Sequence, residues 1–225
     1  MNEICIGNIR LICCDCTDVM RQTSDDSFDL AVVDPDYGLH RRLRGGQWAQ
    51  RWGNDGMTLG GVPDAGYFRE LMRISRNQII WGGNYFTNFL PPSRCFLVWD
   101  KKDKNNTMAD CEMAWTSFDR NARVFNSARN PGGITGKGRI HMCQKPVQLY
   151  MWILDMFAGP GDSVLDTHLG SASSAIAVYE VNKRLRAGGY PEISFTGIEI
   201  NGEYFRKAVD RVMAHMRMYP ENVLT

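Results

Sequence analysis

The residues best suited to chemistry are Asp-Pro-Asp-Tyr at positions 34–37. They follow residues 28–33, a short apolar run rich in β-branched side chains, which predicts a strand buried on both faces inside a parallel sheet. Pro35 and Gly38 would end that strand. A carboxylate, a stiffened backbone and an aromatic ring would then lie at the carboxyl end of a buried strand, where open α/β sheets bind ligands. Taken alone, the tetrapeptide also fits an ordinary turn.

A second candidate loop lies at residues 166–171, after a short predicted strand at 163–165 and before a helix of small residues. A strand, a Gly-rich turn and a helix can hold a nucleotide-like ligand, because backbone N–H groups point outward there. The sequence lacks the full Gly-x-Gly-x-x-Gly fingerprint, so a generic strand-to-helix turn is an equal alternative. Glu199 ends the next predicted strand, 193–200, and suits a grip on ribose hydroxyls.

The bulk composition limits the class of protein. The chain has 225 residues and a formal net charge of +1, with 44% hydrophobic residues, which predicts one soluble domain and excludes a polycation. No apolar run is long enough for a membrane span, and the N-terminal residues lack a signal-peptide pattern. The seven cysteines are an odd number, and Cys5, Cys13 and Cys14 lie in apolar, strand-like stretches, which predicts reduced, mostly buried thiols in a cytoplasmic protein and no metal site.

Hydrophobic periodicity predicts the elements that position the two loops. Residues 4–14 fit two short strands around a Gly-Asn turn, and Thr17 is expected to cap a short helix through Arg21. The remaining predicted elements are helices at 65–76, 146–157 and 203–216, strands at 78–81, 95–99 and 112–118, and a polar loop at 182–192. The expected order alternates strands and helices, as in a Rossmann-like sheet.

Two basic stretches, at about 39–62 and 100–140, are predicted insertions that contact nucleic acid. The first interleaves arginines with tryptophans, and guanidinium groups suit phosphates while flat rings suit bases. A solvated basic loop with its tryptophans folded onto the domain is the alternative. The second carries further positive charges, including Arg120 and Arg123. The predicted contacts are Arg41, Arg42, Arg44, Trp48, Arg51, Arg129, Lys137 and Arg139.

Together these stretches resemble the DNA amino-methyltransferases, which transfer methyl from S-adenosylmethionine to adenine N6 or cytosine N4. The shared motifs are Asp-Pro-Asp-Tyr at 34–37, Lys-Pro at 145–146, the 166–171 loop and Gly-Ile-Glu-Ile at 197–200. The catalytic motif precedes the cofactor motif, as in the permuted β group, and the stretches 81–86 and 163–207 resemble small phage and prophage members. The resemblance implies one α/β, Rossmann-like methyltransferase domain over residues 1–225, with a mostly parallel seven-stranded sheet and helices on both faces.

The resemblance also implies a role for each motif. Asp34 and the Pro35 carbonyl would accept the two amino hydrogens of the target base, and Tyr37 would stack on the base after it leaves the duplex. Asp36, in the same catalytic loop, stands where the family usually has Pro, and Ala172 where it usually has Gly. The cofactor would contact Asp15, Cys16, Asp34, Lys145, Pro146, Asp166, Thr167, His168, Leu169, Gly170, Ser171 and Glu199.

The sequence therefore predicts a site-specific adenine-N6 methyltransferase that binds S-adenosylmethionine and double-stranded DNA, alone or as a homodimer. Asp at position 34 favours adenine over cytosine N4 by resemblance. A nicotinamide-dependent oxidoreductase would leave the catalytic tetrapeptide without a role, and an inactive DNA-binding module would be supported by Asp36 and Ala172 alone. Lys145 also fits a surface lysine at a helix start, and His168 an ordinary loop histidine.

Overall fold

The computed structural model describes residues 2–38, 61–102, 109–127, 140 and 143–218. Its strands are β1 (Asn2–Ile6), β2 (Ile9–Cys13), β3 (Phe28–Val33), β4 (Ser75–Trp81), β5 (Phe96–Asp100), β6 (Cys111–Thr116), β7 (Arg123–Asn126), β8 (Ser163–Asp166) and β9 (Ser194–Glu199). Its helices are α1 (Cys16–Gln22), α3 (Ala65–Ile74), α4 (Val147–Phe157), α5 (Ser173–Ala187) and α6 (Gly202–Met218), with the 3₁₀ turn η2 (Gly83–Tyr85).

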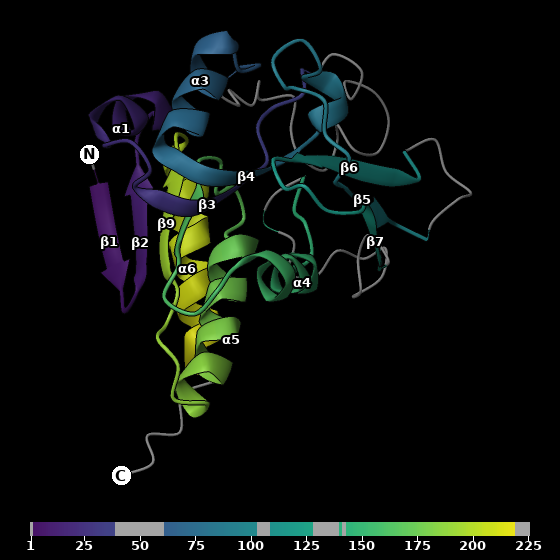
Figure 1. The fold of residues 1–225 in the computed structure, drawn as a ribbon. Helices are drawn as coiled ribbons and strands as arrows, with labels where there is room; N and C mark the ends of the chain where they lie inside the picture. Colours follow the sequence, from purple (N-terminus) through teal and green to yellow (C-terminus); the bar gives the residue numbers. More distant parts are fainter. Residues whose placement is uncertain (1, 39–60, 103–108, 128–139, 141–142, 219–225) are drawn as a thin grey trace, which may run out of the picture.

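These strands form one sheet in the order β1-β2-β9-β8-β3-β4-β6-β5-β7 (Figure 1). Neighbours from β2 through β4 run parallel, which confirms the predicted α/β fold with a mostly parallel sheet. β6 is antiparallel to β4 and to β5, and β7 is parallel to β5. The carboxyl ends of the parallel strands, the start of β6 and the ends of β5 and β7 therefore share one edge, which we call the carboxyl edge.

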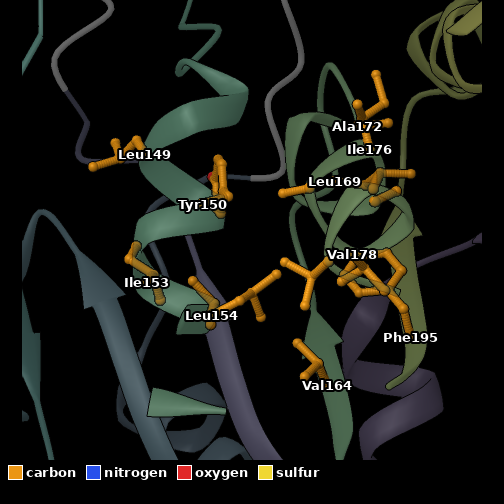
Figure 2. Close-up of a cluster of buried hydrophobic side chains, with 14 of the residues drawn as sticks. Leu149, Tyr150, Ile153, Leu154, Val164, Leu169, Ala172, Ile176, Val178 and Phe195 are labelled. Carbon is orange, nitrogen blue, oxygen red and sulfur yellow. The ribbon is translucent and has the colours of Figure 1, made fainter. Parts of the chain in front are cut away.

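Alternate side chains of the parallel strands enter two separate cores. Leu30 and Val32 of β3 face α4, α5 and α6, while Ala31 and Val33 face α1 and α3. Figure 2 shows part of the first core, where side chains of α4 and α5 meet over strands β8 and β9. Burial on both faces explains why these strands have continuous apolar sequences. The prediction of helices on both faces of the sheet is confirmed.

The predicted count of seven strands is wrong, because nine strands pair in the described residues. One of them, β7, lies in the predicted basic insertion at about 100–140, where no strand was expected after residue 118. Its four residues are mostly exposed, so their strand conformation comes from pairing with β5, in which Val124 lies opposite Val98. Such pairing leaves no periodic apolar signal in a short stretch of sequence.

Three local predictions also differ from the structure. The expected loop at 182–192 starts as helix, because α5 continues to Ala187, and the buried Asn182 side chain bonds both backbone groups of Ile193 at 2.8 Å. The predicted helix at 65–76 ends at Ile74, since the next residue begins β4. Asp15, not Thr17, caps α1: its carboxylate accepts the Thr17 N–H at 2.8 Å.

All seven cysteines lie in the described ranges and carry free thiols. Only Cys95 is buried, so the prediction of mostly buried thiols is wrong. Of the helices in the described ranges, none combines the length and the apolar character that crossing a bilayer requires.

Candidate active site

The loops after β3 and β8 open onto the same edge of the sheet. The two strands are parallel neighbours, with Ala31 opposite Leu165. Asp34 therefore follows β3 at the same end at which Asp166 closes β8. β9 pairs in parallel with β8 on its other side and brings Glu199 to this edge. The structure thus places both predicted motifs along one row of strand ends.

Asp34 makes two hydrogen bonds in the interior of this edge. Lys145 donates to its Oδ2, and the Tyr37 hydroxyl donates to its Oδ1. Burial raises the pKa of Asp34 above its ordinary value, and the Lys145 ammonium opposes this rise. One carboxylate oxygen is thus bound to a cation, while the other is bound to a neutral hydroxyl that another donor could replace.

Lys145 is only 4% exposed, which excludes the alternative of a surface lysine at the start of α4. Its Nζ lies 3.1 Å from Glu112 Oε2 as well as against Asp34. The ammonium also lies 5.2 Å from the Trp81 ring centroid and 5.9 Å from the Tyr37 ring centroid. Burial lowers the pKa of Lys145, but the two carboxylates outweigh burial and raise it above its ordinary value. Lys145 therefore carries a proton at neutral pH.

Sequence reasoning missed two members of this network, Glu112 and Lys101. Glu112 is the second residue of β6, and its Oε1 lies 2.6 Å from the Nζ of Lys101, a buried residue that follows β5. Burial raises the pKa of Glu112, but Lys145 and Lys101 outweigh it and bring the pKa to about 2. The only signal in the sequence was a Glu within a predicted apolar strand. Its partners are set by strand register, which the sequence does not display.

The Tyr37 ring packs against Gly82 and Tyr85, which follow β4. The two tyrosine rings stack with centroids 5.1 Å apart and an interplanar angle of 16°. Gly82 has φ +70°, and a Cβ atom built there would lie 2.1 Å from Tyr37 Cε1. Position 82 therefore requires glycine both for its backbone and for the space that the ring occupies. Tyr85 remains 48% exposed beside the ring.

The loop after β8 is held by its own first residue. Asp166 accepts the His168 backbone N–H at 3.0 Å and the Ser174 hydroxyl at 2.6 Å. Burial raises the pKa of Asp166 to about 7. Ala172 adopts a left-handed conformation with φ 58° and packs its methyl group in the core. The position where the resembled family usually has Gly is thus one that needs a positive φ, and here alanine adopts it.

Glu199 links this loop to β9. Its carboxylate accepts the backbone N–H of Gly170 and that of Asn201, each at 2.9 Å. Burial raises the pKa of Glu199, and these hydrogen bonds oppose the rise. Because each carboxylate oxygen can accept more than one hydrogen bond, both oxygens keep acceptor capacity for a ligand hydroxyl.

His168 belongs to a hydrogen-bonded row of three side chains. Its Nδ1 lies 2.9 Å from Thr167 Oγ1, which lies 2.7 Å from the Tyr67 hydroxyl of α3. Burial lowers the pKa of His168 to about 4, so the imidazole is neutral at pH 7. The ring therefore offers hydrogen-bonding atoms without charge.

Asp15 and Cys16 lie beside Glu199, because the Cys14 N–H donates to the Glu199 carbonyl at 3.1 Å. Hydrogen bonds from the Thr17 side chain and backbone lower the pKa of Asp15. Burial raises the pKa of the Cys16 thiol to about 12, which keeps it neutral. This corner thus presents a carboxylate and an uncharged thiol.

The remaining predicted cofactor residues have structural contacts. Pro146 immediately precedes α4, as expected for a helix start. Leu169 packs into the first core and donates its N–H to the Ile198 carbonyl at 2.8 Å. Ser171 accepts a hydrogen bond at its carbonyl from Arg211 of α6. In the catalytic loop, Asp36 accepts the Gly38 N–H at 2.8 Å.

The predicted nucleic-acid contacts Arg41, Arg42, Arg44, Trp48, Arg51, Arg129, Lys137 and Arg139 lie outside the described residues. The described residues next to these predicted contacts can be placed relative to the carboxyl edge. Gly38 follows β3, and Ser127 follows β7, so these two described residues lie near the carboxyl edge. Arg120 instead follows β6 at the opposite edge, where it donates to the Met156 carbonyl at 2.8 Å. Arg120 is thus remote from Asp34.

Comparison with known proteins gives the family. The family model N6_N4_Mtase, described as DNA methylase, matches residues 75–210, which is more than half of the chain. None of the curated proteins compared with the sequence matches it.

Solved structures share the fold at low sequence identity. The M1.HpyAVI–SAM complex is 18% identical, with 91% of this chain and 98% of that chain covered and a TM-score of 0.55. A proposed DNA modification methylase from Thermus thermophilus, complexed with S-adenosyl-L-methionine, is 16% identical over 91% and 95%, with a TM-score of 0.55. The cytosine-N4-specific PvuII DNA methyltransferase is 11% identical over 95% and 92%, with a TM-score of 0.62. With the family match, these results confirm the resemblance seen in the motifs: the chain belongs to the N6-adenine and N4-cytosine DNA methyltransferase family.

Proposed function

We propose that this protein methylates adenine N6 in double-stranded DNA with S-adenosylmethionine as methyl donor. The observation that carries the proposal is the position of Asp34, a largely buried carboxylate at the strand end next to the 166–171 loop. Methylation of an amine requires a hydrogen-bond acceptor for the amine next to the loop that holds the methyl donor. The aspartate at this position favours adenine over cytosine by family resemblance, as the sequence predicts.

The residues along the carboxyl edge fit this cofactor. S-adenosylmethionine carries a sulfonium, an ammonium and two ribose hydroxyls, and the edge presents the carboxylates of Asp15, Asp34, Asp166 and Glu199. Opposite charges in a partly buried site attract strongly. We assign Glu199 to the ribose, the 166–171 loop with Lys145-Pro146 to the methionine part, and Asp15 and Cys16 to the adenine part. When bound, the cofactor supplies an electrophilic methyl group.

Asp34 prepares the target nitrogen for attack. In an exocyclic amine the lone pair is delocalised into the ring, which makes the nitrogen a poor nucleophile. Asp34 Oδ1 would exchange the Tyr37 hydroxyl for one amino hydrogen of adenine, and the Pro35 carbonyl would accept the other. Both acceptors favour a tetrahedral nitrogen with a free lone pair, and the fixed backbone orients them in advance. The proton that the nitrogen loses after methylation would pass to Asp34 Oδ1.

Tyr37 has two roles in this proposal. Before the base arrives, its hydroxyl occupies Asp34 Oδ1, so a buried acceptor is not left unpaired. When the base rotates out of the duplex, the Tyr37 ring would provide a stacking surface for it.

The Tyr37 position gives a testable prediction at Gly82. Gly82→Ala places a Cβ atom into the Tyr37 ring, so we expect about a 10-fold or greater loss of methyl transfer through misplacement of the ring. The positive φ adds about 1–2 kcal/mol of destabilisation. Gly189→Ala is the matched control, because Gly189 has φ +74° and no atom within 4 Å of a built Cβ. Urea denaturation should show a larger loss for Gly82→Ala than for Gly189→Ala, because the clash with Tyr37 adds to the cost of the positive φ, and equal activities would contradict the proposed slot.

The basic segments give a second prediction. If Arg41, Arg42 and Arg44 contact phosphates, changing all three to Ala lowers the slope of log K against log salt by about 2.7, at about 0.9 per phosphate. Lys183, Arg184 and Arg186 changed to Ala form the control, since they remove the same charge near the end of α5, away from the carboxyl edge. Fluorescence anisotropy with duplex DNA at several salt concentrations measures both slopes. Equal slopes in the two triple variants would exclude the 39–62 segment as a DNA contact.

Product analysis tests the proposed function directly. The purified protein is incubated with unmethylated duplex DNA and labelled S-adenosylmethionine, and the DNA is then hydrolysed to nucleosides for mass spectrometry. We expect N6-methyladenine. N4-methylcytosine would keep the chemistry and change the base, while cofactor binding without any methylated base would refute the activity.

A further inference from the structure

The network around Asp34 extends away from the predicted cofactor loop through two more charged side chains. Lys145 Nζ lies 3.1 Å from Glu112 Oε2, and Lys101 Nζ lies 2.6 Å from Glu112 Oε1. Four groups therefore alternate in sign in the order Lys101, Glu112, Lys145 and Asp34. They come from the ends of β5 and β3, the start of β6 and the residue before the α4 cap, and sheet topology brings all of them to the carboxyl edge.

Glu112 is the central anion of this row, because each of its carboxylate oxygens faces a different lysine. Both lysines are almost fully buried, so neither ammonium can rely on water to balance its charge. Lys101 is also stacked 5.4 Å from the Trp99 ring centroid, which fixes the outer end of the row. A buried charge becomes strongly destabilising when its oppositely charged neighbour is removed.

We propose that Glu112 is a positioning residue for methyl transfer: it keeps Lys145 protonated and fixed on Asp34 Oδ2, so that Asp34 presents its Oδ1 to the target amine. This inference rests on the proposed function, and it deepens the role of the same site. Glu112 would not touch the base or the cofactor. It would act through Lys145, and Lys101 would act through Glu112.

A purely structural ion pair between β5 and β6 would make different predictions. Glu112→Gln removes one anion and leaves Lys101 and Lys145 with Asp34 as the remaining partner in the row. A positioning role then predicts that kcat falls while the KM for S-adenosylmethionine changes little. Adding Lys101→Met removes the surplus cation and restores the charge balance around Lys145. The double variant should therefore regain activity. Because removing both members of a buried ion pair also relieves the cost of an unpaired charge, the fall in kcat at a nearly unchanged KM separates the positioning role from a purely structural pair.

The kinetic experiment compares four proteins: wild type, Glu112→Gln, the double variant and Glu180→Gln. Glu180 is the matched control, because its side chain is 23% exposed against 25% for Glu112 and it also pairs with a lysine, Lys183. We expect Glu112→Gln to lower kcat by about 10- to 100-fold, with the cofactor KM within about 3-fold. The double variant should recover at least about 3-fold in kcat. Unchanged kcat in Glu112→Gln would overturn the inference.

A second measurement does not depend on activity. NMR of lysines labelled at the side chain follows the Lys145 amine against pH, with the Lys145→Met spectrum as its assignment. We expect the amine to lose its proton at a lower pH in Glu112→Gln than in wild type or in Glu180→Gln. If Lys145 loses its proton at the same pH in Glu112→Gln and in wild type, the inference is overturned. If the Lys145 titration shifts in Glu112→Gln but the wild-type protein methylates no DNA, the proposed function alone is refuted, so the two failures are distinguishable.

Discussion

Asp34→Asn is expected to lower kcat for methyl transfer by about 10³-fold, while S-adenosylmethionine binds within a few-fold of wild type. The amide keeps the size of the side chain and one acceptor oxygen. It cannot take the proton that the amine releases, and its NH₂ group or its single oxygen must face the Lys145 ammonium. Single-turnover transfer measures the chemical step, and calorimetry measures cofactor affinity.

The control is the same substitution at an exposed position on α4. Asp155 pairs with Arg184 at the surface, so Asp155→Asn should change kcat by less than about 2-fold. A wild-type rate in Asp34→Asn would remove Asp34 from the chemistry. A loss of cofactor binding equal to the loss of rate would instead place Asp34 in the cofactor site alone.

The pH dependence of kcat in wild type has a defined sign. Burial raises the pKa of Asp34, and the mechanism requires its ionised form. As pH falls through that raised pKa, the carboxyl takes up a proton and loses its acceptor lone pair. The rate should therefore decline on the acid side at a pH above the ordinary value of 3.8 for an aspartate. Asp155→Asn should show the same acid limb.

The part of the site that could be predicted follows from the buried parallel strands. Residues 30–33 and 164–165 are apolar because both faces of their strands are covered, and so the sequence shows where each strand ends. In parallel neighbours those ends lie at one edge by topology. The positions of Asp34 and of the 166–171 loop were thus predictable without any side-chain contact.

The partners of Asp34 depend on information that no short stretch of sequence contains. Lys145 is 111 residues away from Asp34 in the chain. Glu112 reaches Lys145 because β6 runs antiparallel to β4, with Ala114 opposite Trp81. Sequence patterns predicted both strands, but neither their direction nor their register. Lys145 therefore fitted a surface lysine and a buried one equally well until the strand order was known.

The requirement for glycine at position 82 also depends on a partner that is distant in the sequence. The motif around it was visible in the sequence, and its glycines indicated a turn after a buried strand. The reason for glycine at this position is the Tyr37 ring, which comes from a different strand end. A turn motif predicts the backbone conformation, whereas the neighbour that needs the space appears only in the fold.

Lys145→Met is expected to destabilise the protein by about 3–5 kcal/mol at pH 8, because it leaves Asp34 without its cation and Glu112 with only Lys101. Loss of the ammonium raises the folded-state pKa of both carboxyls, so the folded variant takes up protons more readily than the folded wild type. Its stability relative to wild type should improve as pH falls from 8 to 5, since protonation removes the unpaired charge. Urea denaturation at several pH values measures this difference.

The surface lysine Lys183 provides the comparison, since it forms an ion pair with Glu180 one turn away on α5. Lys183→Met should change stability by less than about 0.5 kcal/mol at every pH. A destabilisation of Lys145→Met that stays constant with pH would mean that lost packing of the lysine stem, not lost charge, causes it. In that case Asp34 would keep its ionisation without Lys145, and the acid limb of kcat would stay where it is in wild type. If the charge is responsible, that limb must move to higher pH together with the recovery of stability, because one carboxyl controls both.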